Sequence, residues 1–120
     1  MSTHLIESIA RVCHEANRGY CQTLGDLSQP PWDEAPQWLR DSALAGVTFA
    51  LANPEATPQQ MHESWLMEKL RDGWRFGPTK DAEKKTHPCA VSYYALPPAQ
   101  QMKDRIFKVI VETMSATKEL

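Results

Sequence analysis

Aromatic and basic side chains gather in one segment that is punctuated by glycine and proline, residues 73–88, which reads GWRFGPTKDAEKKTHP. Trp74 and Phe76 stand at alternate positions, so their rings share a face if the backbone is extended. The basic residues that follow are Lys80, Lys84, Lys85 and His87. A ring beside several cations suits an aromatic anion such as a nucleotide, because the ring stacks on the base while the ammonium groups meet the phosphate. The alternative is that both rings pack in the core and the lysines are solvated.

Two histidine–glutamate pairs, His14-Glu15 and His62-Glu63, resemble half of a zinc-protease motif. That motif needs a second histidine three residues after the glutamate, and neither pair has one. Ser64 lacks the GxSxG turn that exposes a serine nucleophile, and the sequence has no glycine-rich phosphate loop. The sequence therefore predicts a protein with no enzymatic activity, no metal site and no cofactor.

Length and composition favour a single globular domain over residues 1–120, with 42% hydrophobic and 23% charged residues. The three cysteines include no CxxC pair and are expected to be reduced thiols. A net charge of −2 argues against a general nucleic-acid binder and against an anionic-membrane binder. The sequence shows neither a signal peptide nor an apolar run long enough to cross a membrane. We therefore expect a cytoplasmic protein.

The charge is unevenly distributed along the chain, because residues 1–70 carry −5 and residues 71–120 carry +3. This bias predicts a dipolar surface, one face of which could attract an anionic group. A solvated lysine-rich loop would give the same bias.

Apolar residues that recur every three or four positions predict four helices. The first covers about residues 3–24, and the second begins at Asp33 or Glu34, has Pro36 in its first turn and ends at Asn53-Pro54. The third begins after Thr57, which with Gln60 has the residues of a capping box. It stops at residues 72–73, and the fourth helix covers about residues 98–117.

The region between the third and fourth helices, residues 74–94, has no helical period and is predicted to be a long loop with two short strands, 74–76 and 90–93. The fold class is therefore mainly α: a compact bundle of about four helices with a long loop and a short β-hairpin. Trp38 and Leu70 are expected on buried helix faces, and Trp32 is expected to be half exposed. Lys103 and Asp104 are expected to face water.

Several motifs in this chain together resemble the RyR domain, the ryanodine-receptor repeat, in its single-copy bacterial or phage form. They are PPWDE at residues 30–34, Asn53-Pro54, HESW at 62–65, DGWRFGP at 72–78, KDAEKKTHPC at 80–89 and YYALPP at 93–98. The resemblance extends from about Cys13 to Met114, and the motifs occur in the family's order and spacing. Phe76 stands where the family usually has tyrosine, and Ser92 where it usually has proline.

The resemblance implies a regulatory or interaction module without catalytic activity. Such repeats occur in tandem pairs on the cytoplasmic periphery of large calcium-release channels, so a single copy suggests a homodimer that restores the pair. The family resemblance also suggests a nucleotide-derived ligand. We therefore predict a non-enzymatic module that binds a small anionic nucleotide-type ligand. The alternative is a module that binds a protein partner through Met61, Trp38 or the carboxyl-terminal surface.

The predicted ligand-binding residues combine the basic and aromatic segment with motif residues. They are Trp32, His62, Trp74, Arg75, Lys80, Asp81, Lys84, Lys85 and His87. Trp74 or Trp32 would stack on the base, and the lysines or Arg75 would meet phosphate. For the polar members a scaffold role is the alternative, with Glu63 holding backbone amides of the loop and Asp81 capping a turn.

Overall fold

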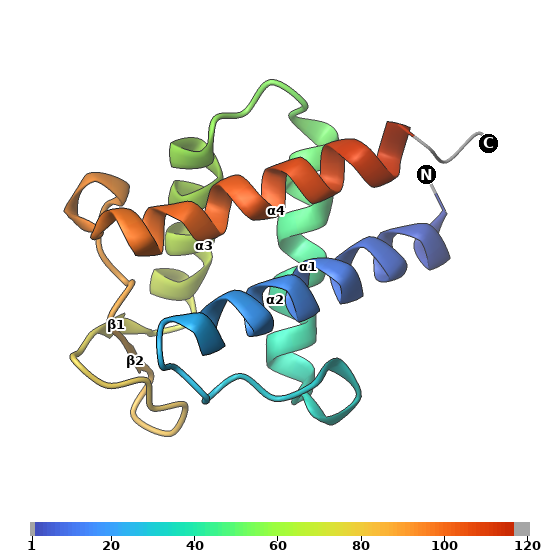
Figure 1. Cartoon of the computed structure of the whole chain (residues 1–120). Helices are drawn as coiled ribbons and strands as arrows, with labels where there is room; N and C mark the ends of the chain where they lie inside the picture. The colour runs from blue at the N-terminus through green and yellow to red at the C-terminus, as the bar shows by residue number, and fades with distance from the viewer. Residues whose placement is uncertain (1, 117–120) are drawn as a thin grey trace.

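The chain folds into four long helices joined by loops that contain two short 3-10 helices and a small sheet (Figure 1). The computed structural model describes residues 2–116. The helices are α1 (Thr3–Thr23), α2 (Gln37–Ala52), α3 (Pro58–Arg71) and α4 (Pro98–Ala116). The 3-10 helices are η1 (Trp32–Glu34) and η2 (Tyr93–Ala95), and the strands are β1 (Arg75–Phe76) and β2 (Thr86–His87). The predicted mainly helical class with four helices is confirmed.

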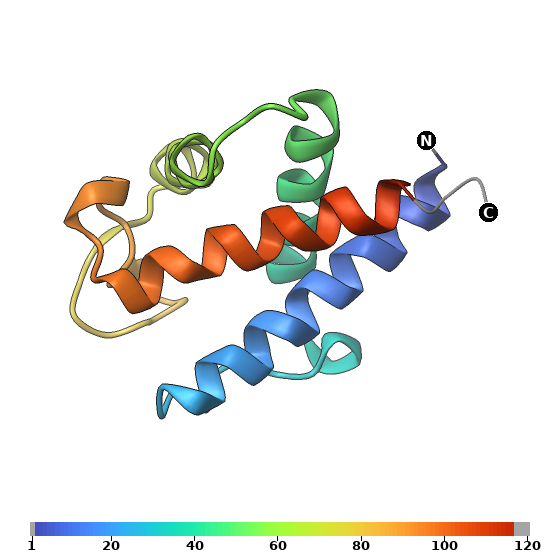
Figure 2. The same cartoon turned by 45° about the horizontal axis from the view of Figure 1, so that its top comes forward.

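The helices α1 and α4 form an antiparallel pair, whereas α2 and α3 are inclined to each other, since Figure 2 shows α3 end-on and α2 from the side. α1 and α4 run side by side in opposite directions, while α2 and α3 lie behind them (Figures 1 and 2). Ile9 of α1, Val47 of α2 and Val111 of α4 are buried where these helices meet. Gly46 allows a close approach between α2 and α4, because a Cβ atom at this position would lie 3.0 Å from the Phe107 Cζ atom. The sheet and its loop lie near the end of α1 and the start of α4 (Figure 1).

Local sequence signals set most of the helix ends. The Ser2 hydroxyl caps α1 by accepting from the Leu5 N–H. Thr57 and Gln60 form the predicted capping box at the start of α3, with each side chain accepting from the other residue's backbone N–H. Gly25 and Gly73 follow α1 and α3 with φ of 83° and 89°, a conformation that glycine adopts without steric cost.

The start of α2 differs from the prediction. A first turn that begins at Asp33 or Glu34 and includes Pro36 is wrong, because Pro36 is the N-cap residue and the helix begins at Gln37. Ala35 is extended, at φ −70° and ψ 137°, as the residue before a proline usually is. The short helix η1 therefore ends before α2 begins.

The two strands pair in parallel, so the predicted β-hairpin is wrong. Arg75 lies opposite Thr86, and Phe76 lies opposite His87. The predicted second strand at residues 90–93 is also wrong, since that stretch leads into η2. The Asp81 carboxylate accepts from the backbone N–H groups of the turn that follows it, and Lys85 adopts a φ of 55°. These two features turn the chain so that Thr86 returns alongside β1 in the same direction.

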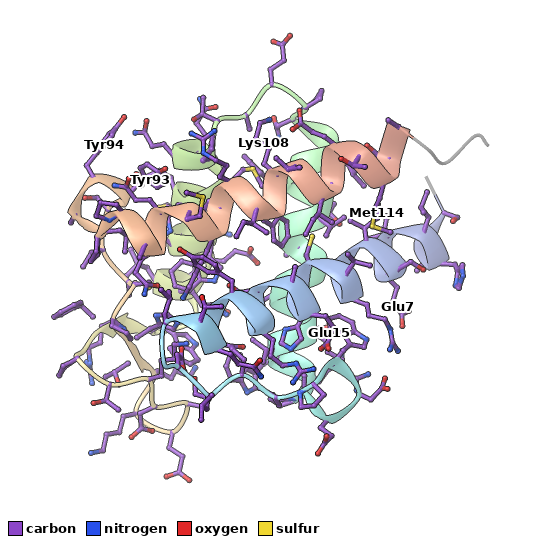
Figure 3. All side chains as sticks on the ribbon, in the orientation of Figure 1. Glu7, Glu15, Tyr93, Tyr94, Lys108 and Met114 are labelled. Atoms are coloured by element: carbon purple, nitrogen blue, oxygen red, sulfur yellow. The ribbon has the colours of Figure 1, made fainter. Side chains whose placement is uncertain are left out.

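Trp32 is a core residue with 3% of its surface exposed, so the expectation of half exposure is wrong. The Arg40 guanidinium lies 5.5 Å from its ring centroid, and the His14 ring packs edge-on against it at 5.7 Å. The Glu15 carboxylate accepts from the Trp32 N–H at 3.0 Å. In Figure 3 the Glu15 side chain points toward the segment that contains η1. These contacts from α1 and α2 surround the indole.

Two residues that were expected on buried helix faces are more exposed than predicted. Trp38 is 42% exposed and Leu70 is 49% exposed. Over residues 2–116, none of the helices is long and apolar enough to span a membrane.

Candidate functional site

A cavity of about 500 Å³ lies among the four helices and the loop that precedes β2. Its wall includes Cys13 of α1, Ser42 of α2, Met61 of α3, Phe107 of α4 and Ala82 of the loop. This volume is within the range of small-molecule binding sites, which are typically about 300–1,000 Å³. The cavity is therefore large enough for a small organic ligand.

One side of the cavity is lined by five rings, here called the aromatic wall: Trp38, Trp74, His87, Trp65 and His62. Successive ring centroids along the wall are 5.2, 6.4, 5.1 and 5.4 Å apart. These separations match those of interacting aromatic pairs in proteins. The rings of the wall come from four parts of the fold: helix α2, the residue that precedes β1, strand β2, and helix α3. The packing of the sheet therefore positions the rings.

The row of rings continues from His62 to the surface through η2. The Tyr93 ring lies 6.1 Å from His62, and the Tyr94 ring lies 5.6 Å from Tyr93. Tyr94 is 74% exposed and points away from the body of the protein (Figure 3). Its hydroxyl donates to the Gln59 side chain at 2.8 Å. The motif residues of α3, the sheet and η2 therefore pack against one another.

Lys69 of α3 places an ammonium group between two rings of the wall. The side chain lines the cavity and the residue is only 7% exposed. Its Nζ atom lies 5.2 Å from the Trp38 ring centroid and 5.4 Å from that of Trp74. Within residues 2–116 this ammonium has neither a hydrogen-bond acceptor nor a carboxylate at ion-pair distance. Burial lowers the pKa of Lys69, although Asp72 and Glu68 oppose this effect.

His87 of β2 is a neutral imidazole at the middle of the wall. Its Nδ1 atom accepts from the Cys89 N–H at 2.9 Å, so the ring proton is on Nε2. Burial, together with smaller effects of the positive charges of Lys80, Lys103 and Lys69, lowers the pKa of His87 to about 3. The three lysines line the same cavity, as do the acidic residues Glu68, Asp81 and Asp104.

At the other end of α3, His62 faces the Asp104 carboxyl of α4. The His62 Nε2–H donates to the Val91 carbonyl at 2.7 Å, and Nδ1 lies 3.7 Å from the Asp104 Oδ2 atom. Burial raises the pKa of Asp104 to about 7, against a smaller opposing effect of Lys103. Both Asp104 and Lys103 line the cavity, so the expectation that they face water is wrong.

Several of the predicted polar residues hold the loop in place. The Lys80 ammonium forms an ion pair with Asp26 at 2.7 Å. Asp81 caps the turn of the loop, as its scaffold interpretation expected. The Lys85 ammonium donates to the Asp72 carbonyl at the end of α3. Glu63 makes no such contact to the loop in the part of the chain that is described, and His62 provides the corresponding anchor through Val91.

The structure brings together five of the nine predicted site residues. Those that line the cavity are His62, Trp74, Lys80, Asp81 and His87. Those that do not line it are Trp32, Arg75, Lys84 and Lys85. Trp32 is buried beside α1, and the other three are exposed on the loop and β1.

Sequence reasoning missed Lys69, Asp104 and Lys103 as cavity residues. For Lys69 a signal was available, because it follows His62 by seven positions and Trp65 by four, which places all three on one helix face. For Asp104 there was no comparable signal, since its burial depends on contacts from another helix.

The family model described as RyR domain matches residues 50–118. This range contains α3, the sheet, η2 and α4, and therefore four of the five rings of the aromatic wall. Trp38, the fifth ring, and the cavity residues of α1 lie before it.

Proposed function

Because the chain belongs to the RyR domain family, we propose that it is a non-enzymatic binding module whose cavity takes a small nucleotide-type anion. The observation that carries this proposal is the ammonium of the buried residue Lys69, which faces the cavity beside two indoles with no carboxylate at ion-pair distance among residues 2–116. An anionic ligand group would supply a partner of opposite charge. The aromatic wall would supply the stacking surface for its ring.

Partial burial removes part of the hydration of the Lys69 ammonium, and the two cation–π contacts offset only part of that loss. A hydrogen bond between charged groups contributes about 1.5–3 kcal/mol. The ligand's phosphate or carboxylate would therefore gain affinity from Lys69, with the Nε2–H of His87 and the ammonium of Lys103 as further donors that line the cavity.

The aromatic wall offers a stacking surface for the ring of the ligand. Stacking of a nucleobase on an aromatic side chain is worth about 1–3 kcal/mol. Trp65 and Trp74 both line the cavity on either side of His87 in the aromatic wall. A flat ring placed along this wall would lie within reach of Lys69, because Trp74 itself contacts the lysine.

The thiols that line the cavity favour binding over covalent chemistry. Burial raises the pKa of Cys13 to about 12 and raises the pKa of Cys89. A thiol is nucleophilic as its thiolate, so these shifts keep both residues in the unreactive form.

The test is isothermal titration of the purified protein with AMP, GMP, ADP-ribose and cyclic dinucleotides. At least one probe should bind, and Lys69→Met should weaken it by about 10- to 100-fold through loss of the charge-assisted contact. Methionine has a similar length and is apolar, so the variant should remain folded by circular dichroism. The matched control is Lys84→Ala, at an exposed loop residue outside the cavity wall, which should bind like the wild type.

Two results would overturn the proposal: none of the probes binds the wild-type protein, or Lys69→Met binds as tightly as the wild type. The protein-partner alternative stays a prediction, as do the homodimer and the cytoplasmic location. Met61 is 7% exposed and so offers little surface to a partner, whereas Trp38 is 42% exposed. If the titrations are negative, sedimentation of the chain and capture of partners become the next measurements.

A further inference from the structure

The polar groups of the cavity are separated along α3. Lys69 is seven residues after His62, and at 1.5 Å per residue this places their backbones about 10 Å apart along the helix axis. Asp104 is at the His62 end, with its carboxylate 3.7 Å from the imidazole. Trp65 lies between the two ends on the same face of the helix. The cavity therefore has the Lys69 ammonium, with Glu68 also on the wall, at one end and a carboxyl and an imidazole at the other.

The end of the cavity formed by Asp104 and His62 presents the Asp104 carboxyl as a hydrogen-bond acceptor. The His62 Nε2–H donates to the Val91 carbonyl, and Nδ1 lies 3.7 Å from the Asp104 Oδ2 atom, beyond hydrogen-bond distance. An ionised carboxylate is an acceptor only. Over residues 2–116, Asp104 accepts no hydrogen bond, and its side chain is 20% exposed. The Asp104 carboxyl thus faces the cavity with no donor within hydrogen-bond distance in that part of the chain.

Resting on the proposed function, we infer that Asp104 determines ligand specificity by accepting adjacent N–H donors of the ligand's ring, so that the site selects guanine nucleotides over adenine nucleotides. Guanine carries two neighbouring N–H groups on its Watson–Crick edge, and a carboxylate with two oxygens can accept both. Adenine has one amine beside a bare ring nitrogen, which would face the carboxylate as a second acceptor. The separation of about 10 Å between the two ends lets a base meet Asp104 while its phosphate meets Lys69.

This recognition changes the protonation of the site. Burial raises the pKa of Asp104 to about 7, so a substantial fraction of this carboxyl carries a proton at about pH 6.5 before a ligand binds. The charged and titratable groups near it are His62 from α3, Lys103 from α4 and the Cys89 thiol from the segment after β2. Two donors from guanine stabilise the ionised form, so binding of a guanine nucleotide releases a proton. A ligand that does not contact Asp104 releases none there.

The experiment compares AMP and GMP by isothermal titration at about pH 6.5 in two buffers that differ in ionisation enthalpy. The wild type should bind GMP at least about tenfold more tightly than AMP, because a site built around hydrogen bonds rejects analogues that leave its groups unpaired. GMP binding should also release a proton. Asp104→Asn keeps the shape of the side chain but replaces one acceptor by a donor. This variant should bind the two nucleotides within about threefold of each other and release no proton.

The outcomes separate this inference from the proposed function. If AMP binds through Lys69 as tightly as GMP does, or if Asp104→Asn keeps the guanine preference, the inference is overturned and the proposed function stands. If no nucleotide binds the wild type, both are overturned. Lys84→Ala is the matched control, since Lys84 is an exposed loop residue outside the cavity wall and its loss should leave the preference unchanged.

Discussion

Replacing His87 by asparagine should change the way in which the stability of the protein depends on pH. The ring is held neutral in the folded state, because burial and then the charges of Lys80, Lys103 and Lys69 lower its pKa from 6.5 to about 3. In the unfolded chain the same imidazole binds a proton as soon as the pH falls below about 6.5. Its contribution to stability is therefore present above pH 6.5 and is lost as the pH falls from 6.5 toward 3.

The size of this effect follows from the two pKa values. One pKa unit corresponds to about 1.4 kcal/mol, so the full fall from 6.5 to about 3 amounts to at most about 5 kcal/mol. Asparagine has no titration in this range. Its side-chain oxygen can also replace Nδ1 as the acceptor for the Cys89 N–H, which donates at 2.9 Å in the native protein. His87→Asn should therefore remove the pH dependence with little other change to the backbone.

Asp104 works in the opposite direction. Burial raises its pKa from 3.8 to about 7, so the unfolded chain loses this proton at a lower pH than the folded protein does. The contribution of Asp104 is present below about pH 3.8 and is lost as the pH rises toward 7, by at most about 4 kcal/mol. In the wild type the pH-dependent contributions of His87 and Asp104 to the free energy of unfolding largely cancel between about pH 4 and pH 6.5. In His87→Asn only the Asp104 effect remains.

The assay is urea unfolding followed by circular dichroism at about pH 4, 5.5 and 7. In the wild type, His87 and Asp104 together should leave the free energy of unfolding nearly independent of pH. The variant His87→Asn should become less stable as the pH rises. The double variant with Asp104→Asn should be flat again. A His87→Asn profile that is parallel to the wild-type profile, or that rises with pH, would refute the assignment of a buried neutral imidazole.

Three further substitutions test the fold by urea unfolding at neutral pH. Gly77→Ala should cost about 1–3 kcal/mol, because the new Cβ atom would lie 2.6 Å from the Thr86 Cβ across the parallel strand pair; an unchanged midpoint would contradict this close approach. Thr57→Ala should cost about 1 kcal/mol by removing the acceptor for the Gln60 N–H, and Thr57→Ser should restore most of it. Trp32→Ala should cost about 3–5 kcal/mol, and a loss below about 1 kcal/mol would show that the indole is not the core residue described above.

The helices could be predicted because their signals are local. Thr57 and Gln60 formed the expected capping box, and Gly73 adopts the positive φ that ends α3. The sheet could not be predicted in the same way, because its pairing depends on a turn in which Lys85, rather than a glycine, has a positive φ. Lysine in that conformation has no sequence signature, so a hairpin was the natural expectation for two nearby strands.

The candidate site could be predicted only in part, for a related reason. His62, Trp74 and His87 belong to recognisable motifs and do line the cavity. Asp104 is a charged residue type on an amphipathic helix, and the apolar periodicity of α4 alone predicts that it is exposed to solvent. Its burial comes from the neighbouring α3, which the pattern of α4 does not contain. Conversely, Trp32, between Pro31 and Asp33, was expected to be half exposed, but contacts from two other helices bury it.

The division of the four tryptophans gives the protein a built-in optical reporter. Trp38, Trp65 and Trp74 line the cavity, whereas Trp32 lies outside its wall in contact with His14 and Arg40. Any occupant of the cavity would alter the emission or quenching of three indoles and leave the fourth as an internal reference. The variant Trp32→Phe would remove that constant background. The fluorescence of the unlabelled protein could then follow occupancy in real time, at concentrations far below those that calorimetry needs.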